Sequence, residues 1–257
     1  MYKDIETQTS YKYLKEVIGS LNEPICILGG WAVFFHVNEG FAKAQGRPYL
    51  GSRDIDLGFS VGKKMEDSAL AKAIEILTKK LKFQWVSFRL LKEIHTETGK
   101  EIKKGENVPS HLIFPMYVDV IVDSIPTNFK KQFGFTPIDE PLLKGVFEKN
   151  EFTPMREFKR KLLLPTSEYL LAMKVNSLPE RDKEHKKIKD LCDLFALAWY
   201  SSSVNIKKIR LTDYVPEKNI KRCLKAIADD DMAKASAQLG DSKEEVRSVI
   251  LALLGEK

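Results

Sequence analysis

The chain has 257 residues, of which 43% are hydrophobic and 30% are charged, as is ordinary for a soluble protein of one or two domains with a sizeable core. No run of about eighteen apolar residues occurs, and the first residues lack the basic and apolar blocks of a signal peptide, so we expect no membrane span and a cytoplasmic protein. The formal charge of +6 favours anionic partners such as nucleotides or RNA, with the lysines spread along the chain.

The cysteine content argues against a disulfide scaffold and against a zinc site. The chain has three cysteines, Cys26, Cys192 and Cys223, which are widely spaced and embedded in apolar segments. An odd number without metal-ligand spacing is typical of buried thiols. We therefore expect no structural metal.

The first recognisable feature is a glycine pair between a strand and a helix. An amphipathic helix is predicted over residues 5–21, and the apolar run at residues 25–28 predicts a buried strand that enters Gly29-Gly30. Such a pair lets a ligand approach the backbone and directs free amide groups, with the positive end of the helix dipole, at an anion. A phosphate group fits this turn. A plain tight turn with no ligand is the alternative.

Two acids follow, after a loop expected over residues 38–50. The stretch at residues 51–59 reads Gly-Ser-Arg-Asp-Ile-Asp-Leu-Gly-Phe and places Asp54 and Asp56 two residues apart. On a strand, both carboxylates leave one face while the apolar neighbours leave the other. Such carboxylates can converge on one Mg²⁺ or bracket a pair of ions, as in phosphoryl-transfer sites. The alternative is an edge strand with a solvated acidic face.

A further strand, predicted over residues 111–125, carries Asp119 and Asp123 among apolar residues. A buried carboxylate is costly unless a cation, hydrogen bonds or a metal stabilises it. Asp119 is therefore a candidate third ligand if its strand pairs beside the Asp54 strand, because neighbouring strands lie about 4.8 Å apart. Asp123 lies nearer the strand end, where a role in the turn is equally compatible with the sequence.

The remaining pattern divides the chain into an α/β portion and a helical portion. A helix is predicted over residues 64–81 and a β-rich segment over residues 83–94, and only helices are predicted beyond residue 165. We expect an α/β domain at residues 1–164 and a helical domain at residues 165–257.

Three short motifs occur in an order that resembles the DNA polymerase beta-like nucleotidyltransferase superfamily. They are Gly29-Gly30, Asp54-Ile-Asp56 and Val118-Asp119-Val120. The resemblance implies an α/β (α+β) fold in which a mixed sheet with flanking helices is followed by a C-terminal helical domain. It also implies a Mg²⁺-dependent transfer of a nucleoside monophosphate.

The same resemblance assigns roles to individual residues. The turn at Gly29 and Gly30 would hold the nucleotide phosphates, and Asp54 and Asp56 would bind Mg²⁺ at a site with room for two ions. Asp119 would be a further metal ligand and would help to activate the acceptor hydroxyl. Ser52 and Arg53 correspond to an arginine-containing segment before the paired acids, which makes them candidates for nucleotide binding.

The helical portion is similar to the AbiEii branch of that superfamily, the nucleotidyltransferase toxins of type IV toxin–antitoxin systems. The similarity lies in Glu168-Tyr-Leu-Leu-Ala-Met-Lys174, then Arg181, then Lys189-Asp190-Leu-Cys-Asp193. It implies that Lys174 and Asp190 are needed for activity and that Lys174 and Asp193 help to bind the nucleotide. From the residues alone, an ion-pair network on a helix surface is the alternative for both aspartates.

The function expected from sequence is thus the transfer of a nucleoside monophosphate from an NTP such as ATP to a hydroxyl acceptor, with release of pyrophosphate. The toxin resemblance suggests RNA, including a tRNA 3′ end, as acceptor and an antitoxin protein as partner. A small-molecule or protein acceptor is an alternative. A non-catalytic nucleotide-binding or RNA-binding protein on the same scaffold is another.

Overall fold

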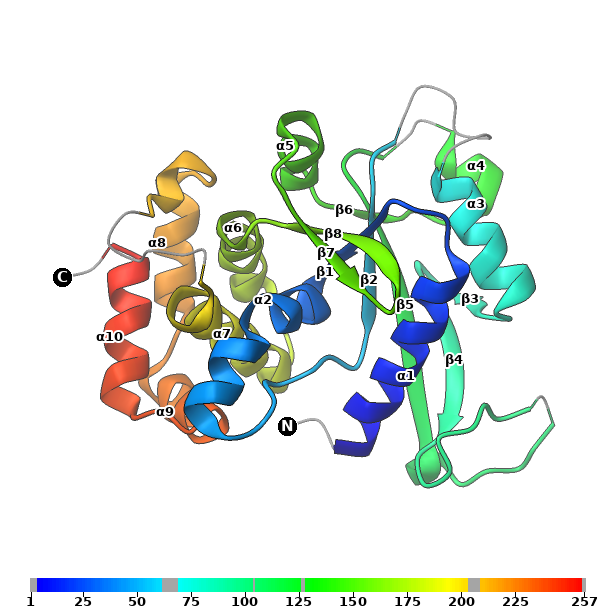
Figure 1. Ribbon diagram of the computed structural model, residues 1–257, viewed down its shortest axis with the longest axis horizontal. Helices are drawn as coiled ribbons and strands as arrows, with labels where there is room; N and C mark the ends of the chain where they lie inside the picture. The colour runs from blue at the N-terminus through cyan, green and yellow to red at the C-terminus, as the bar shows by residue number, and fades with distance from the viewer. Residues whose placement is uncertain (1–3, 62–68, 104, 126–127, 203–208, 256–257) are drawn as a thin grey trace. The chain divides into compact units, whose positions relative to one another are not determined.

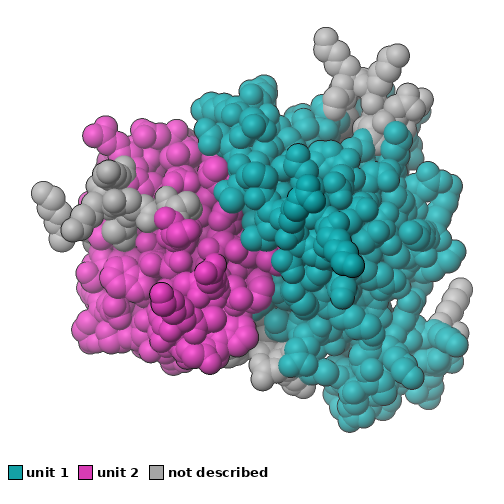
Figure 2. Space-filling model, viewed as in Figure 1, with its two compact units in different colours: residues 1–31, 51–164 teal, residues 32–50, 165–257 magenta. Residues whose placement is uncertain are grey.

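The computed structural model describes residues 4–61, 69–103, 105–125, 128–202 and 209–255. The chain forms two compact units, residues 1–31 with 51–164 and residues 32–50 with 165–257 (Figure 2). Residues 32–50 group with the second unit, although the sequence-based division assigns them to the α/β domain. The division into two domains at residue 164 stays a prediction. Over the described ranges, no helix is both long enough and apolar enough to cross a membrane.

Unit 1 contains a sheet and the helices that flank it (Figure 1). Its helices are α1 (Asp4–Ser20), α3 (Ala69–Glu75, continued by a π-helical segment, Ile76–Lys80), α4 (Phe129–Phe133) and α5 (Leu142–Lys149), with a 3-10 turn at Ser110–Leu112. Its strands are β1 (Ile25–Leu28), β2 (Ile55–Phe59), β3 (Gln84–Val86), β4 (Arg89–His95), β5 (Ile113–Val122), β6 (Ile138–Asp139), β7 (Phe152–Glu157) and β8 (Arg160–Pro165).

The sheet is mixed and eight-stranded, with the order β3-β4-β5-β2-β1-β8-β7 and with β6 paired to β5. The pairs β2·β5, β1·β8 and β5·β6 are parallel, whereas β1·β2, β3·β4 and β4·β5 are antiparallel. The expected fold class, a mixed sheet with flanking helices followed by helices, is therefore confirmed.

The two faces of the sheet differ because side chains alternate along each strand. One face carries Ile55 and Leu57 of β2 and Val118 and Val120 of β5, all buried. Helices α1 and α3 contribute to covering this face, with Leu14, Val17 and Ile18 of α1 and Leu70 and Leu77 of the α3 segment fully buried. The opposite face carries the acids, so apolar burial on one side fixes which way the carboxylates point.

Unit 2 is helical. It contains most of α2 (Gly29–Gln45), then α6 (Ser167–Ser177), α7 (Glu184–Tyr200), α8 (Glu217–Ala226), α9 (Asp229–Leu239) and α10 (Lys243–Leu253), with 3-10 turns at Leu178–Glu180 and Leu211–Asp213. Helix α7 is its centre, because Ile188 and every residue from there through Ala198 is buried.

The helices of the structure differ from two of the sequence-based expectations. The loop expected over residues 38–50 is wrong as far as Gln45, because α2 continues through it. Gly40 is compatible with this helix, and a Cβ there would lie 2.5 Å from the carbonyl oxygen of Tyr200. The sequence predicted two helices after residue 215 but missed α9, and the predicted helix at 64–81 is described only from Ala69, with residues 64–68 outside the described part.

Candidate active site

The three predicted carboxylates of unit 1 lie on one face of two adjacent strands. Strands β2 and β5 run parallel, and Asp56 is the register partner of Asp119. Asp54 precedes Asp56 by two residues, immediately before β2, and therefore shares its face. The expectation that the Asp119 strand pairs beside the Asp54 strand is confirmed.

Arg89, the first residue of β4, joins two of these acids. It is the register partner of Asp119 on the other side of β5. Its Nε and Nη2 donate to Asp119 Oδ1 and Oδ2 at 2.5 and 2.8 Å, and Nη2 also donates to Asp54 Oδ2 at 2.8 Å. The guanidinium carbon lies 4.0 Å from the ring centre of Tyr117, so the fork is held between a ring and two carboxylates.

The electrostatics of this cluster follow from that geometry. Burial lowers the pKa of Arg89, but hydrogen bonding and charge attraction from Asp119, with Asp54 behind it, raise the pKa overall. The guanidinium therefore stays charged at every accessible pH. It compensates negative charge at the point where two aspartates converge.

Gly29 brings the start of α2 against Asp56. Gly29 has a φ of +59°, and a Cβ built on it would lie 1.8 Å from Asp56 Oδ2. Only glycine satisfies both the left-handed backbone and the lack of space. The Asp56 carboxylate thus lies directly beside the first residues of α2, where helix amide groups and the helix dipole favour negative charge.

The donor set suits a hard divalent cation, although the carboxylates do not form a ready-made cage. Within the described residues, no group of three or more His, Cys, Asp or Glu side chains converges as a metal-binding cluster. Asp54 and Asp119 converge instead on the Arg89 guanidinium, which shows that the space between them accepts a positive charge. Carboxylate oxygens are the ligands that Mg²⁺ prefers, so these residues fit Mg²⁺ once the guanidinium has moved.

Of the two neighbouring candidates, Arg53 lies away from the carboxylates. Arg53 pairs with Glu6 of α1 at 3.2 Å and lies over the ring of Phe114 at 5.1 Å, on the apolar face of the sheet. Strand alternation explains this, because Arg53 is an odd number of residues from Asp54 and Asp56. Ser52 is buried in the same connection. The structure does not bring Arg53 together with the carboxylates.

Asp123 joins the ends of β2 and β5 and is not part of the cluster. Its Oδ2 accepts from Ser60 Oγ at 2.8 Å, and its Oδ1 accepts from the backbone N–H of Val61 at 2.9 Å. These bonds favour a role for Asp123 in the turn over a role as a metal ligand.

Unit 2 brings together the other predicted residues, Lys174, Asp190 and Asp193. Lys174 Nζ on α6 lies 2.5 Å from Asp190 Oδ1 and 2.7 Å from Asp193 Oδ2, both on α7. Arg181 also pairs with Asp190 at 2.6 Å, and Lys189 pairs with Asp193 at 2.5 Å. Both aspartates are buried, so they do not form a network on a helix surface.

The hydroxyl of Tyr49 completes this buried cluster by donating to Asp193 Oδ1 at 2.8 Å. Burial opposes charge on Lys174, but attraction from Asp190 and Asp193 raises its pKa overall. Burial likewise raises the pKa of Asp190, but Lys174 and Arg181 lower it overall. Lys174 and Asp190 are therefore both ionised at neutral pH and compensate each other inside unit 2.

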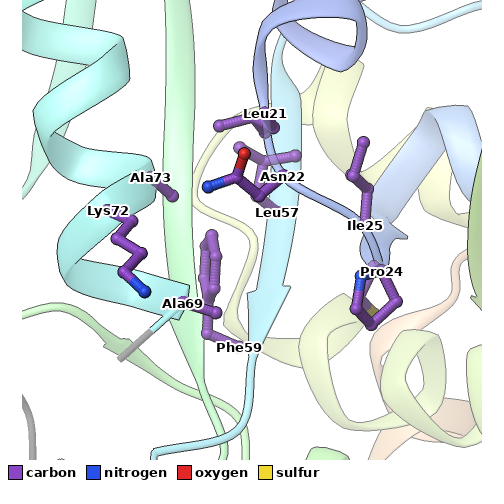
Figure 3. A pocket seen from close by; sticks show the side chains of 10 residues that line it. Leu21, Asn22, Pro24, Ile25, Leu57, Phe59, Ala69, Lys72 and Ala73 are labelled. Atoms are coloured by element: carbon purple, nitrogen blue, oxygen red, sulfur yellow. The ribbon is translucent and has the colours of Figure 1, made fainter. Parts of the chain in front are cut away.

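A pocket lies on the apolar face of the sheet and not at the acids. It is lined by Leu21, Asn22, Pro24, Ile25, Cys26, Leu57, Phe59, Ala69, Lys72 and Ala73, which come from β1, β2, α3 and the connection after α1 (Figure 3). Its water-accessible space is about 20 Å³. That is room for about one water molecule, which excludes a nucleotide.

Arg89 is the residue that sequence reasoning missed. A signal for it exists, because a cation is one way to stabilise an acid in an apolar strand and Arg89 lies within the β-rich segment predicted over residues 83–94. The sequence does not give the register between β4 and β5, and that register is what places Arg89 opposite Asp119.

No protein-family model matches the chain, and no curated protein matches it. Among solved structures, the chain is similar to an antigenic nucleotidyltransferase-like protein from Paracoccidioides brasiliensis, with a TM-score of 0.40, 14% sequence identity, and coverage of 97% of this chain and 93% of that chain.

Proposed function

We propose that the chain is a nucleotidyltransferase that moves a nucleoside monophosphate from an NTP to a hydroxyl acceptor. One observation carries this proposal. Asp56 and Asp119 are register partners on adjacent strands, Asp54 shares their face, and the Asp56 carboxylate lies against Gly29 at the start of a helix. Acids and helix amide groups are thereby adjacent, as a site for a metal-bound triphosphate requires.

The chemistry assigned to the site is an in-line displacement at the α-phosphorus. The acceptor oxygen forms a bond to that phosphorus, the bond to the bridging oxygen breaks, and pyrophosphate leaves. Asp54, Asp56 and Asp119 would hold Mg²⁺, which supplies charge neutralisation at the phosphates. The amide groups at Gly29 and Gly30 would bind phosphate oxygens.

The remaining roles follow from charge. Asp119 would accept the proton of the acceptor hydroxyl once Arg89 no longer occupies its carboxylate. Lys174 would contribute positive charge toward the nucleotide, with Asp190 and Asp193 fixing its position, as their contacts with its Nζ support. The acceptor would be RNA, including a tRNA 3′ end, as the toxin resemblance suggests and the net charge of +6 permits. An antitoxin partner belongs to the same proposal.

A second candidate function is nucleotide or RNA binding without transfer. The observation that favours it is the Arg89 guanidinium, which lies between Asp54 and Asp119 and supplies a permanent positive charge there. A protein that only senses nucleotides has no need to release that cation.

The deciding experiment measures transfer of label from each α-³²P NTP, with Mg²⁺, to total RNA and to the protein itself. We expect RNA labelling by the wild type and its loss in Asp56→Asn, with the fold retained by circular dichroism. Asp123→Asn is the matched control, since that acid bonds to Ser60 at the strand ends, and it should label like the wild type. Nucleotide binding without labelling of RNA, protein or small hydroxyl acceptors would favour the second function.

A further inference from the structure

Arg89 occupies the position that a metal ion would need. Its guanidinium makes a two-point contact with Asp119 and a third contact with Asp54, all at 2.5–2.8 Å. We infer that Arg89 is an exchangeable counter-ion of the acidic site: it neutralises Asp54 and Asp119 in the absence of metal, competes with divalent cations for them, and moves to the nucleotide phosphates when they bind. This inference rests on the proposed function.

The geometry favours exchange over a permanent bridge. The Arg89, Asp54 and Asp119 side chains retain 17%, 22% and 10% of their exposure, so water reaches the cluster and the bridge can open without a large cost of desolvation. A fully buried pair would lack such a route.

Tyr117 gives the released guanidinium a place to remain. Tyr117 lies two residues before Asp119 on the same face of β5, and its ring centre is 4.0 Å from the Arg89 guanidinium carbon. Stacking on the ring holds the cation without using its N–H donors. Those donors can then turn from carboxylates to phosphate oxygens, two of which can accept the two parallel N–H groups of a guanidinium as a carboxylate does.

Charge balance explains why such an exchange is useful. Three carboxylates that face each other repel when neither a guanidinium nor a metal lies between them. Arg89 compensates that repulsion in the free protein. A metal-bound triphosphate retains excess negative charge, and the displaced guanidinium lies next to it. Arg89 therefore weakens metal binding in the free protein and strengthens nucleotide binding, so its effects on the two affinities are opposite in sign.

The test measures Mn²⁺ binding in the absence of nucleotide, by calorimetry and by the electron paramagnetic resonance signal of free Mn²⁺. Arg89→Met removes the competing charge and keeps an unbranched side chain. In the wild type, Mn²⁺ can bind only to those molecules in which Arg89 has released both carboxylates. If these are about a tenth of the free molecules or fewer, the affinity of Arg89→Met for Mn²⁺ should exceed that of the wild type by about tenfold or more. Arg89→Lys, which keeps the charge but not the fork, should lie between them.

Lys92→Met is the matched control. Lys92 is on the same strand, is more buried than Arg89, and pairs with a single carboxylate, Glu101, at 2.6 Å, but it points to the opposite face of the sheet. Its replacement should leave Mn²⁺ affinity unchanged. A second readout is the melting temperature. Without metal, Arg89→Met should unfold at a lower temperature than the wild type, and added Mn²⁺ should raise its melting temperature by more than it raises that of the wild type. For Lys92→Met, the rise on adding Mn²⁺ should equal that of the wild type.

Each outcome decides between the alternatives. Tighter Mn²⁺ binding in Arg89→Met with weaker binding of a non-hydrolysable NTP supports the exchange. Unchanged or weaker Mn²⁺ binding overturns it, and the transferase proposal then still stands if Asp56→Asn abolishes labelling. Absence of Mn²⁺ binding in both the wild type and Arg89→Met overturns the exchange together with the metal site of the proposed function.

Discussion

Two pairs of aspartates in this protein each hold a cation, one on the sheet of unit 1 and the other among the helices of unit 2. Arg89 joins Asp54 to Asp119, and Lys174 joins Asp190 to Asp193. We call Arg89 with Asp54 and Asp119 the first cluster, and Lys174 with Asp190 and Asp193 the second cluster. The cation of the second cluster is 10% exposed and its acids 3% and 0%, whereas the cation of the first cluster is 17% exposed and its acids 22% and 10%.

The two clusters also differ in how many partners each acid has. Asp190 is paired with Arg181 as well as Lys174, and Asp193 with Lys189 and the Tyr49 hydroxyl. A cation surrounded in this way is costly to move, because every partner left behind is a buried charge. If Arg89 exchanges as we infer, similar pairs serve different ends: the partly exposed pair releases its cation, whereas the buried pair keeps Lys174 of helix α6 fixed against helix α7.

The largest expected effect is on activity, at the contact between Gly29 and Asp56. Gly29→Ala should reduce transfer by about 10²-fold or more, since a displacement of about 1 Å at a reacting centre costs that much and the new Cβ requires the Asp56 carboxylate to move. Label transfer and Mn²⁺ affinity are the measurements.

Gly134→Ala is the control that separates this contact from backbone strain. Gly134 has a φ of +79°, and among the residues that the structure describes no atom lies within 4 Å of the position its Cβ would take. Both variants carry the left-handed penalty of roughly 1–2 kcal/mol. Equal transfer by the two variants would show that the contact with Asp56 is unimportant.

The next effect is on stability and concerns unit 2. Asp193→Asn keeps the shape of the side chain but leaves Lys174 and Lys189 buried without its charge, and removal of one partner from a buried pair costs about 3–5 kcal/mol. Urea unfolding measures this loss. Asp230→Asn, whose side chain is 71% exposed and pairs with Lys234, should leave the midpoint unchanged. A small effect of Asp193→Asn would make the second cluster as exchangeable as the first.

The features of the fold and of the site that the sequence predicts are those that depend on residues close together in the chain. The strand at residues 25–28 is bounded by Pro24 and Gly29 and is found with the same limits. The shared face of Asp54 and Asp56 follows from strand alternation alone. Because such alternation is a local property, the sequence alone predicts the carboxylate motifs.

The missed features depend on contacts between distant segments. The pairing of Arg89 with Asp119 requires the register between two strands. Gly40 indicates a loop by local propensity, yet it lies inside α2, where the Tyr200 carbonyl approaches it. Likewise, the burial of Asp190 and Asp193 is a property of the helix packing, which neighbouring lysines in the sequence do not reveal.

The smallest effect is the change of stability with pH, which distinguishes a buried ion pair from an exposed one. Lys174 and Arg181 lower the pKa of Asp190 despite its burial, whereas hydrogen bonding and charge from Lys243, with Arg247, lower the pKa of the exposed Asp229. A lowered pKa in the folded state means that stability is present above the ordinary value of about 4 and is lost as pH falls through the folded value.

The melting temperature should therefore be level near neutral pH and fall below about pH 4, where Asp190 takes up a proton. The difference between the wild type and Asp190→Asn should be largest near neutral pH and shrink on acidification, and it should persist in 0.5 M salt because screening acts weakly on buried charges. Asp229→Asn is matched in having two cationic partners, but its side chain is 61% exposed, so its small difference should vanish in salt. A difference for Asp190→Asn that also vanishes in salt would place the second cluster in contact with solvent, and the contrast with Arg89 would no longer hold.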